Sequence, residues 1–135
     1  MDRLRLNRVI LNLALLLSTG SAVGCDLFGD DTSLYVVRVD SVSAPLTIAS
    51  DQPLEIVFHG LVGFDGCSRL SEVEKESGPG HLRVRFVAER RSGECTQMPV
   101  PLNHVETVPP PLQNPFTITV IQPSGPPLDH VVQVQ

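Results

Sequence analysis

Short stretches in which apolar and polar residues alternate recur along residues 34–135, and they constrain the fold more than any other feature. Residues 82–89 (LRVRFVAE) are the clearest case. A period of two places Leu82, Val84, Phe86 and Ala88 on one face of a β-strand and leaves the charged residues on the other. The same pattern predicts further strands, with the last two ranges the weaker candidates, at Leu34–Val39, Leu54–His59, Phe116–Ile121, Val131–Val134, Leu46–Ala49 and Val100–Val108.

Proline and glycine separate these stretches and disfavour helices. Nine of the twelve prolines fall between Pro99 and Pro127, where each removes a backbone donor. The one helix candidate is Cys67–Ser77, whose Ser-x-x-Glu spacing is typical of a helix start, but Leu70 and Val73 give it so little apolar surface that we expect only a short turn. The pattern therefore predicts an all-β domain, a small immunoglobulin-like antiparallel sandwich, although the tryptophan usual in such cores is absent.

The first 25 residues follow a different pattern. Arg3, Arg5 and Arg8 precede an uncharged stretch that ends in the small-residue sequence Ser21–Gly24, and Cys25 follows directly. A basic start, an apolar middle and a small-residue exit are typical of a secretory signal that is removed from the mature protein.

The end of this segment resembles the lipobox of bacterial lipoproteins, in which signal peptidase II cuts before a cysteine whose thiol carries a diacylglycerol. Gly24 supplies the small residue before the cysteine, and Val23 and Ala22 supply the small or apolar residues before it. The resemblance implies that Cys25 is the lipid attachment site. It also implies that the protein is anchored to a membrane of the bacterial cell envelope.

Two departures from the lipobox pattern leave other interpretations open. Ala22 stands where the family most often has leucine, and Asn12 interrupts the apolar stretch. An ordinary secretory signal cleaved nearby would leave Cys25 unmodified. A retained membrane anchor would need about 20 apolar residues, whereas the uncharged stretch Val9–Cys25 has 17. An amphipathic helix of a cytosolic protein would need a polar face, which Leu13–Leu17 lacks.

The resemblance divides the chain into a signal peptide at residues 1–24, an acidic tether at residues 25–33 and the β-sandwich domain at residues 34–135. The eight residues Asp26–Ser33 reach at most about 25 Å when extended, so the domain is expected close to the bilayer. Asp26 resembles the inner-membrane retention signal of enteric lipoproteins. The choice between inner and outer membrane, and between the periplasm and the cell surface, stays open.

The cysteine count agrees with lipidation. If Cys25 carries lipid, Cys67 and Cys95 remain as a pair, which an oxidising compartment would join in a disulfide. The 27 residues between them would make this bond worth about 3–4 kcal/mol in the chain-entropy model. Because the pair flanks the Leu82–Glu89 strand and the turn before it, we expect the bond to fasten the ends of that segment rather than the sandwich centre.

The charge balance excludes one large class of partner. The ten basic residues include three in the signal and the fifteen acidic residues include one, so residues 25–135 carry seven basic and fourteen acidic side chains. Nucleic-acid binding depends on clustered lysine and arginine, so no nucleic-acid partner is expected for a segment with a formal charge of −7. The same charge leaves attachment to the membrane to the lipid on Cys25.

Residue patterns that carry catalysis or metal binding are missing from the sequence. His59, His81, His104 and His130 have no metal-ligand spacing with one another or with a cysteine. The glycines of Gly60–Gly66 lack the Lys-Ser/Thr pair of a phosphate loop, and no Gly-x-Ser-x-Gly elbow occurs. We therefore expect no catalytic residues, no metal and no cofactor.

Arg83 and Arg85, followed by Arg90 and Arg91, form one local basic patch. They are either the solvated face of a strand, paired with nearby glutamates such as Glu89 and Glu94, or a docking face for an acidic envelope protein. The proline-rich segment Met98–Pro115 has a similar pair of interpretations, an irregular crossover or a polyproline surface.

These patterns predict a membrane-anchored lipoprotein that is not an enzyme and acts as a binding or envelope-structural module. The alternative is an exported inhibitor of a periplasmic enzyme such as a protease. Such an inhibitor would present a loop stiffened near Cys67 or Cys95.

Overall fold

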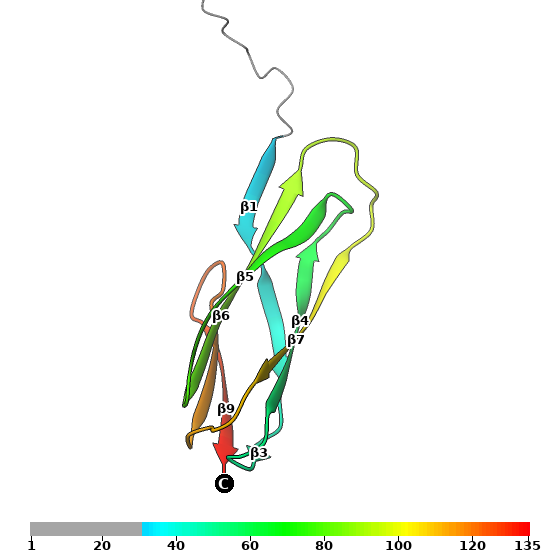
Figure 1. Ribbon diagram of the computed structural model, residues 1–135. Coiled ribbons are helices and arrows are strands. Elements are labelled where there is room, and N and C mark those ends of the chain that lie inside the picture. Colours follow the sequence, from blue (N-terminus) through cyan, green and yellow to red (C-terminus); the bar gives the residue numbers. More distant parts are fainter. Residues whose placement is uncertain (1–30) are drawn as a thin grey trace, which may run out of the picture.

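The computed structural model describes residues 31–135, and the predictions for the signal peptide, for Cys25 and for most of the tether lie outside this range. The described residues form nine strands and no helix (Figure 1). The strands are β1 (Thr32–Val36), β2 (Arg38–Ser43), β3 (Thr47–Ile48), β4 (Leu54–Gly63), β5 (Ser68–Gly78), β6 (His81–Arg91), β7 (Val100–Val108), β8 (Phe116–Val120) and β9 (Leu128–Val134).

The larger sheet has six strands and is organised around β6. β5 pairs antiparallel with β6 along the whole of one edge. The other edge of β6 is shared, since β1 pairs antiparallel with its C-terminal part and β8 pairs parallel with its N-terminal part. β9 lies outside β8 and the short β3 lies outside β9.

The smaller sheet contains β2, β4 and β7, all antiparallel, with β4 in the middle. The chain passes from the larger to the smaller sheet at Val37, which is 1% exposed and whose N–H donates to the carbonyl of Phe86 at 2.9 Å. The predicted single strand Leu34–Val39 is therefore two strands in two sheets.

The core lies between the two sheets, where the alternating residues of β4 and β6 meet. Leu82, Val84, Phe86 and Ala88 are at most 1% exposed, as their alternation predicts. The ring of Phe58 on β4 packs against that of Phe86, with centroids 5.1 Å apart. Burial of these apolar faces is the main stabilising contribution to a fold of two stacked sheets.

The prediction of an all-β sandwich is confirmed, with antiparallel pairing throughout except between β6 and β8 and between β3 and β9. The expectation of a short turn at Cys67–Ser77 is wrong, because residues 68–78 form the edge strand β5. A register shift between Leu70 and Glu72 interrupts its alternation. Leu70 and Val73 face the core on either side of that bulge, so the strand carries no regular apolar pattern.

One side of the sandwich, between β5 and β7, is closed by polar groups. The Nζ atom of Lys75 on β5 donates to Oε1 of Glu106 on β7 at 2.7 Å. His104, also on β7, lies 3.5 Å from the other oxygen of Glu106, and its ring packs edge-on against Phe86 with centroids 5.3 Å apart. Polar residues therefore replace part of the apolar pattern where the two sheets open to solvent.

The start of β1 and two loops lie together at one end of the sandwich. Figure 1 shows that β1 begins at the end opposite the C-terminus. The β4–β5 turn (residues 64–67) and the β6–β7 loop (residues 92–99) lie at the same end, because β1 and β5 both pair there with the last residues of β6. We call these two loops and the start of β1 the tether end.

Candidate functional site

A pocket of about 480 Å³ opens beside the crossover from β1 to β2, close to the tether end. Its walls are more apolar than polar, and they come from β1, β2, the end of β4, the turn after it and the end of β6. The residues used below are Tyr35, Arg38, Leu61, Val62, Phe64 and Arg90. Its volume lies in the range of pockets that hold small molecules or single side chains. We call it the Tyr35 pocket.

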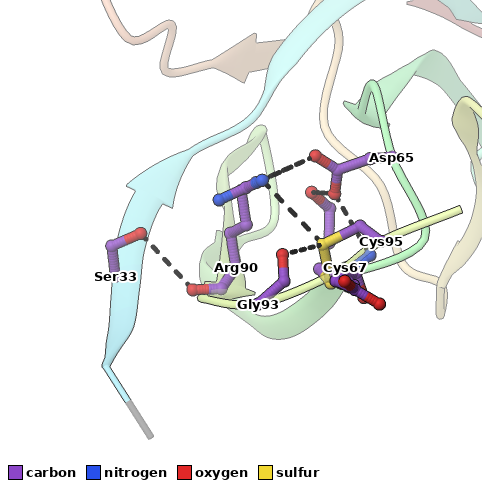
Figure 2. The surroundings of a disulfide bond; sticks show 8 residues. Ser33, Asp65, Cys67, Arg90, Gly93 and Cys95 are labelled. Carbon is purple, nitrogen blue, oxygen red and sulfur yellow. Dashed lines mark hydrogen bonds and ion pairs between the residues drawn. A yellow bond between two sulfur atoms is a disulfide. The ribbon is translucent and has the colours of Figure 1, made fainter. Parts of the chain in front are cut away.

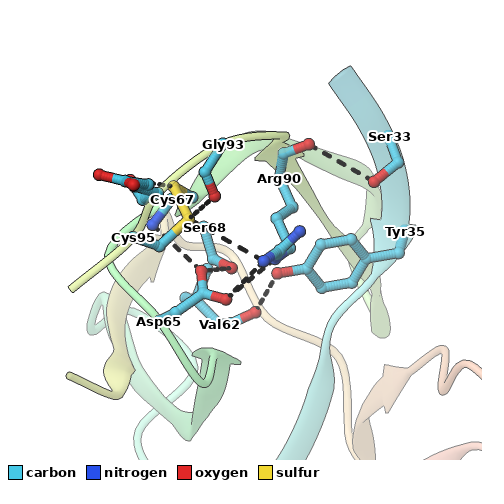
Figure 3. A network of polar contacts seen from close by, with 10 residues as sticks. Ser33, Tyr35, Val62, Asp65, Cys67, Ser68, Arg90, Gly93 and Cys95 are labelled. Atoms are coloured by element: carbon cyan, nitrogen blue, oxygen red, sulfur yellow. Dashed lines mark hydrogen bonds and ion pairs between the residues drawn. A yellow bond between two sulfur atoms is a disulfide. The ribbon is translucent and has the colours of Figure 1, made fainter. Parts of the chain in front are cut away.

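Tyr35 forms one wall of the pocket and is fixed by its hydroxyl. The Oη–H of Tyr35 donates to the main-chain carbonyl of Val62 at the end of β4 (Figure 3). This bond joins β1 of the larger sheet to β4 of the smaller sheet. A partly buried phenol whose hydroxyl is bonded to a carbonyl can use its ring as an apolar surface.

A carboxylate organises the turn below the pocket. Asp65 accepts hydrogen bonds through Oδ1 from the main-chain N–H of Cys67 at 3.1 Å and from the Ser68 hydroxyl at 3.4 Å. Its other oxygen, Oδ2, binds Arg90 (Figure 3). The bond from Arg90 and the main-chain bond lower the pKa of Asp65 below its ordinary value of 3.8, against the opposing effect of partial burial. The carboxylate is therefore held ionised as an acceptor.

The disulfide predicted between Cys67 and Cys95 is present, with the Cα atoms 5.4 Å apart (Figure 2). It joins the residue before β5 to the β6–β7 loop, so the expectation that it fastens the ends of this segment is confirmed. The N–H of Gly66 also donates to the carbonyl of Thr96 at 2.9 Å. The turn and the loop of the tether end are thus fixed to each other by one covalent bond and one hydrogen bond.

A close approach explains the glycine that ends β4, directly before this turn. A Cβ on Gly63 would lie 2.2 Å from the Ser68 hydroxyl oxygen and 3.1 Å from the Tyr35 oxygen. Ser68 is only 5% exposed, so its side chain has little room to move away. The Tyr35 contact and the Asp65 network both depend on the absence of a side chain here.

Asp65, Cys67 and Cys95 are the one group of possible metal ligands that approach one another within residues 31–135. The two sulfur atoms are bonded to each other, and metal binding by cysteine requires the thiolate. This group therefore serves the structure of the turn.

The predicted partner face at Arg83 and Arg85 is the solvated side of the β5–β6 hairpin. Arg85 donates through Nε to Glu74 at 2.7 Å, and Arg83 stands opposite Glu76 in the strand register. Both arginines line a shallow hollow of about 300 Å³ with these glutamates.

The glutamate partners differ from those expected for this patch. Glu89 binds Arg69, and Arg90 binds Asp65 at the Tyr35 pocket. Ion pairs therefore engage Arg85 and Arg90, two of the four arginines of this patch.

The sequence did not identify the Tyr35 pocket. Tyr35 and Arg90 are separated by more than fifty positions, and their proximity depends on the pairing of β1 with β6. A local signal exists at Asp65, because an aspartate two residues before a main-chain N–H is the pattern of an Asx turn.

No protein-family model, curated protein or solved structure matches this chain. Within residues 31–135, no helix has the length and apolar character needed to cross a membrane.

Proposed function

We propose that the protein is a lipid-anchored, non-enzymatic binding module of the bacterial envelope, and that the Tyr35 pocket is its binding site. The observation that carries this proposal is the pocket itself. Its lining is more apolar than polar and includes the charged residue Arg38, and it adjoins a turn made rigid by the Cys67–Cys95 bond. A concave, mostly apolar site with a few fixed polar groups suits a ligand or a protruding side chain.

The polar groups of the pocket support binding rather than catalysis. The hydroxyl of Tyr35 donates a hydrogen bond to the carbonyl of Val62, and the hydroxyl of Ser68 donates one to Asp65. Asp65 is ionised at neutral pH as an ordinary aspartate is, and its lowered pKa keeps it ionised in more acidic solution, so it holds Arg90 and is a poor proton donor. The polar groups of Tyr35, Ser68 and Asp65 therefore serve the shape of the site.

The anchor is supported by the lipobox resemblance and by where the domain begins. β1 starts at Thr32, seven residues after Cys25. If Cys25 carries lipid, the pocket therefore lies near the membrane surface. A Cys25→Ala variant is expected to leave the membrane fraction under detergent-free washing, and its retention there would contradict the anchor.

Photo-crosslinking in intact cells tests the binding site. A photoreactive amino acid at Leu61, in the pocket wall, is expected to give a discrete adduct. The same amino acid at Glu55, exposed near the other end of β4, is the matched control and is expected to give none. The mass of the adduct distinguishes a lipid from a protein ligand. Equal yields from both positions, or none from Leu61, would contradict the proposal.

One observation favours the inhibitor as a second candidate. The β6–β7 loop is exposed on nearly all its residues, Met98 is 68% exposed, and Cys95 fixes the loop to the β4–β5 turn. An exposed loop held by a disulfide is preorganised for binding in a protease cleft. Titration of the purified protein against a panel of proteases is expected to show stoichiometric inhibition if this is its role. Lack of inhibition across the panel would remove the candidate.

A further inference from the structure

The tether end carries an unusual exposed aromatic residue. Phe64, in the β4–β5 turn, is 80% exposed, while Phe58, Phe86 and Phe116 are fully buried. The turn that holds it is rigid, because Asp65, Cys67 and Ser68 are joined by the hydrogen bonds and the disulfide described above. The ring is therefore presented to the outside by a fixed main chain.

Two more exposed apolar side chains lie at the same end. Met98 in the β6–β7 loop is 68% exposed, and Leu34 near the start of β1 is 66% exposed. Gly63 and Val100 are paired in the register of β4 and β7, which brings the segments carrying Phe64 and Met98 next to each other. Half of the six exposed large hydrophobic side chains of the described residues thus lie at the tether end.

The length of the tether limits what can cover this end. Six residues separate Cys25 from Thr32, and the seven residue-to-residue steps between them span at most about 25 Å when fully extended. A lipid on Cys25 therefore holds the start of β1 within that distance of the bilayer. The loops that carry Phe64 and Met98 lie at the same end, so the membrane is the surface nearest to them.

We propose that the tether end is a bilayer-contacting surface, in which Phe64 and Met98 enter the interfacial region of the membrane to which Cys25 is anchored. This inference rests on the proposed lipid anchor and names the bilayer as the partner of the end that adjoins the Tyr35 pocket. Phenylalanine is among the apolar side chains that interfacial segments bury at the boundary between lipid headgroups and acyl chains. At this end Arg69 and Arg90 are paired with Glu89 and Asp65, and the formal charge of the exposed Arg91 at the end of β6 is offset by that of the exposed Glu94 in the β6–β7 loop. The contact is therefore expected to depend mainly on apolar side chains and to change little with salt.

The absence of tryptophan from the chain allows a direct test. Single tryptophans are introduced into the full-length lipidated protein as Phe64→Trp, Met98→Trp and, as the control, Leu46→Trp. Leu46 is 75% exposed, and its carbonyl accepts from Gln133 beside the C-terminal strand, which places it at the opposite end. Each variant is reconstituted into phosphatidylcholine vesicles with or without dibrominated phosphatidylcholine, and the vesicles are isolated by flotation.

The inference predicts that the emission of Phe64→Trp and Met98→Trp shifts to shorter wavelength and is quenched by the brominated lipid, while that of Leu46→Trp is not. Flotation without quenching at residues 64 and 98 would overturn the membrane contact alone and leave this end free for a protein partner. Equal quenching at all three positions would also overturn it, because the contact would not belong to one end. Failure to float would reject the lipid anchor and the contact together.

Discussion

Arg90 binds Asp65 through two of its nitrogens, with Nε at 3.0 Å and Nη2 at 2.9 Å from the same carboxylate oxygen, Oδ2. The two residues are 25 positions apart and meet where β6 ends beside the start of β5. Through its other oxygen, the carboxylate also accepts from the N–H of Cys67. The side chain of Asp65 therefore joins the end of β6 to the turn that carries Phe64 and the first cysteine of the disulfide.

The Asp65–Arg90 pair predicts a defined loss of stability in acid. The pKa of Asp65 is lowered in the folded protein, chiefly by the bond from Arg90, so the contribution is complete above the unfolded pKa of about 3.9 and is lost as the pH falls through the folded value. Urea unfolding at neutral pH and at low pH should show a smaller acid-induced loss for Asp65→Asn than for the unaltered protein. The exposed Asp51→Asn is the control and should retain the full loss. Equal losses in all three proteins would contradict the prediction.

The Cys67–Cys95 bond predicts that substitution of either cysteine lowers the stability of the protein by the same amount. Cys67→Ala and Cys95→Ala should each lower the free energy of unfolding by about 3–4 kcal/mol, and the double variant should cost no more than either single one. Chemical denaturation measures these losses, and the unaltered protein in reductant should behave like the variants. Clearly unequal single losses would indicate that one cysteine has a role outside the bond.

The close approach of Gly63 to Ser68 predicts that substitutions at the two positions affect stability in a coupled way. The Cβ of Gly63→Ala would meet the buried Ser68 hydroxyl at 2.2 Å, so we expect a loss of about 1–3 kcal/mol in unfolding free energy. The loss should shrink in a Ser68→Gly background, which a double-mutant cycle measures. Gly80→Ala is the matched control, because no atom lies closer than 3.5 Å to its Cβ, and it should cost less. An undiminished loss in the Ser68→Gly background would show that the strain has another source.

The sequence predicts a strand most reliably where buried and exposed residues alternate regularly along it. β6 and β8 alternate regularly between buried and exposed or half-buried residues, and both were expected. β5 was missed because a bulge shifts its register and because its core-facing positions include Ser68 and Lys75, which pair with Asp65 and Glu106. Edge strands tolerate such polar positions since solvent or a neighbouring strand can satisfy them.

Relations between distant segments could not be predicted from local pattern. The division of Leu34–Val39 at Val37 follows from its packing between two sheets, and the parallel pairing of β6 with β8 follows from chain topology. For the site, counting cysteines was enough to predict the disulfide. The Asp65–Arg90 pair and the Tyr35 pocket exist only once β1, β5 and β6 are side by side.

The intact mass of the protein extracted from membranes with detergent, measured with and without reductant, tests the central claim most directly. The account predicts a chain of residues 25–135 carrying lipid on Cys25, with a mass that rises by two hydrogens when the Cys67–Cys95 bond is reduced. A chain that starts at another residue, or one that starts at Cys25 without lipid, would contradict the anchor on which the membrane-facing orientation of Phe64 depends.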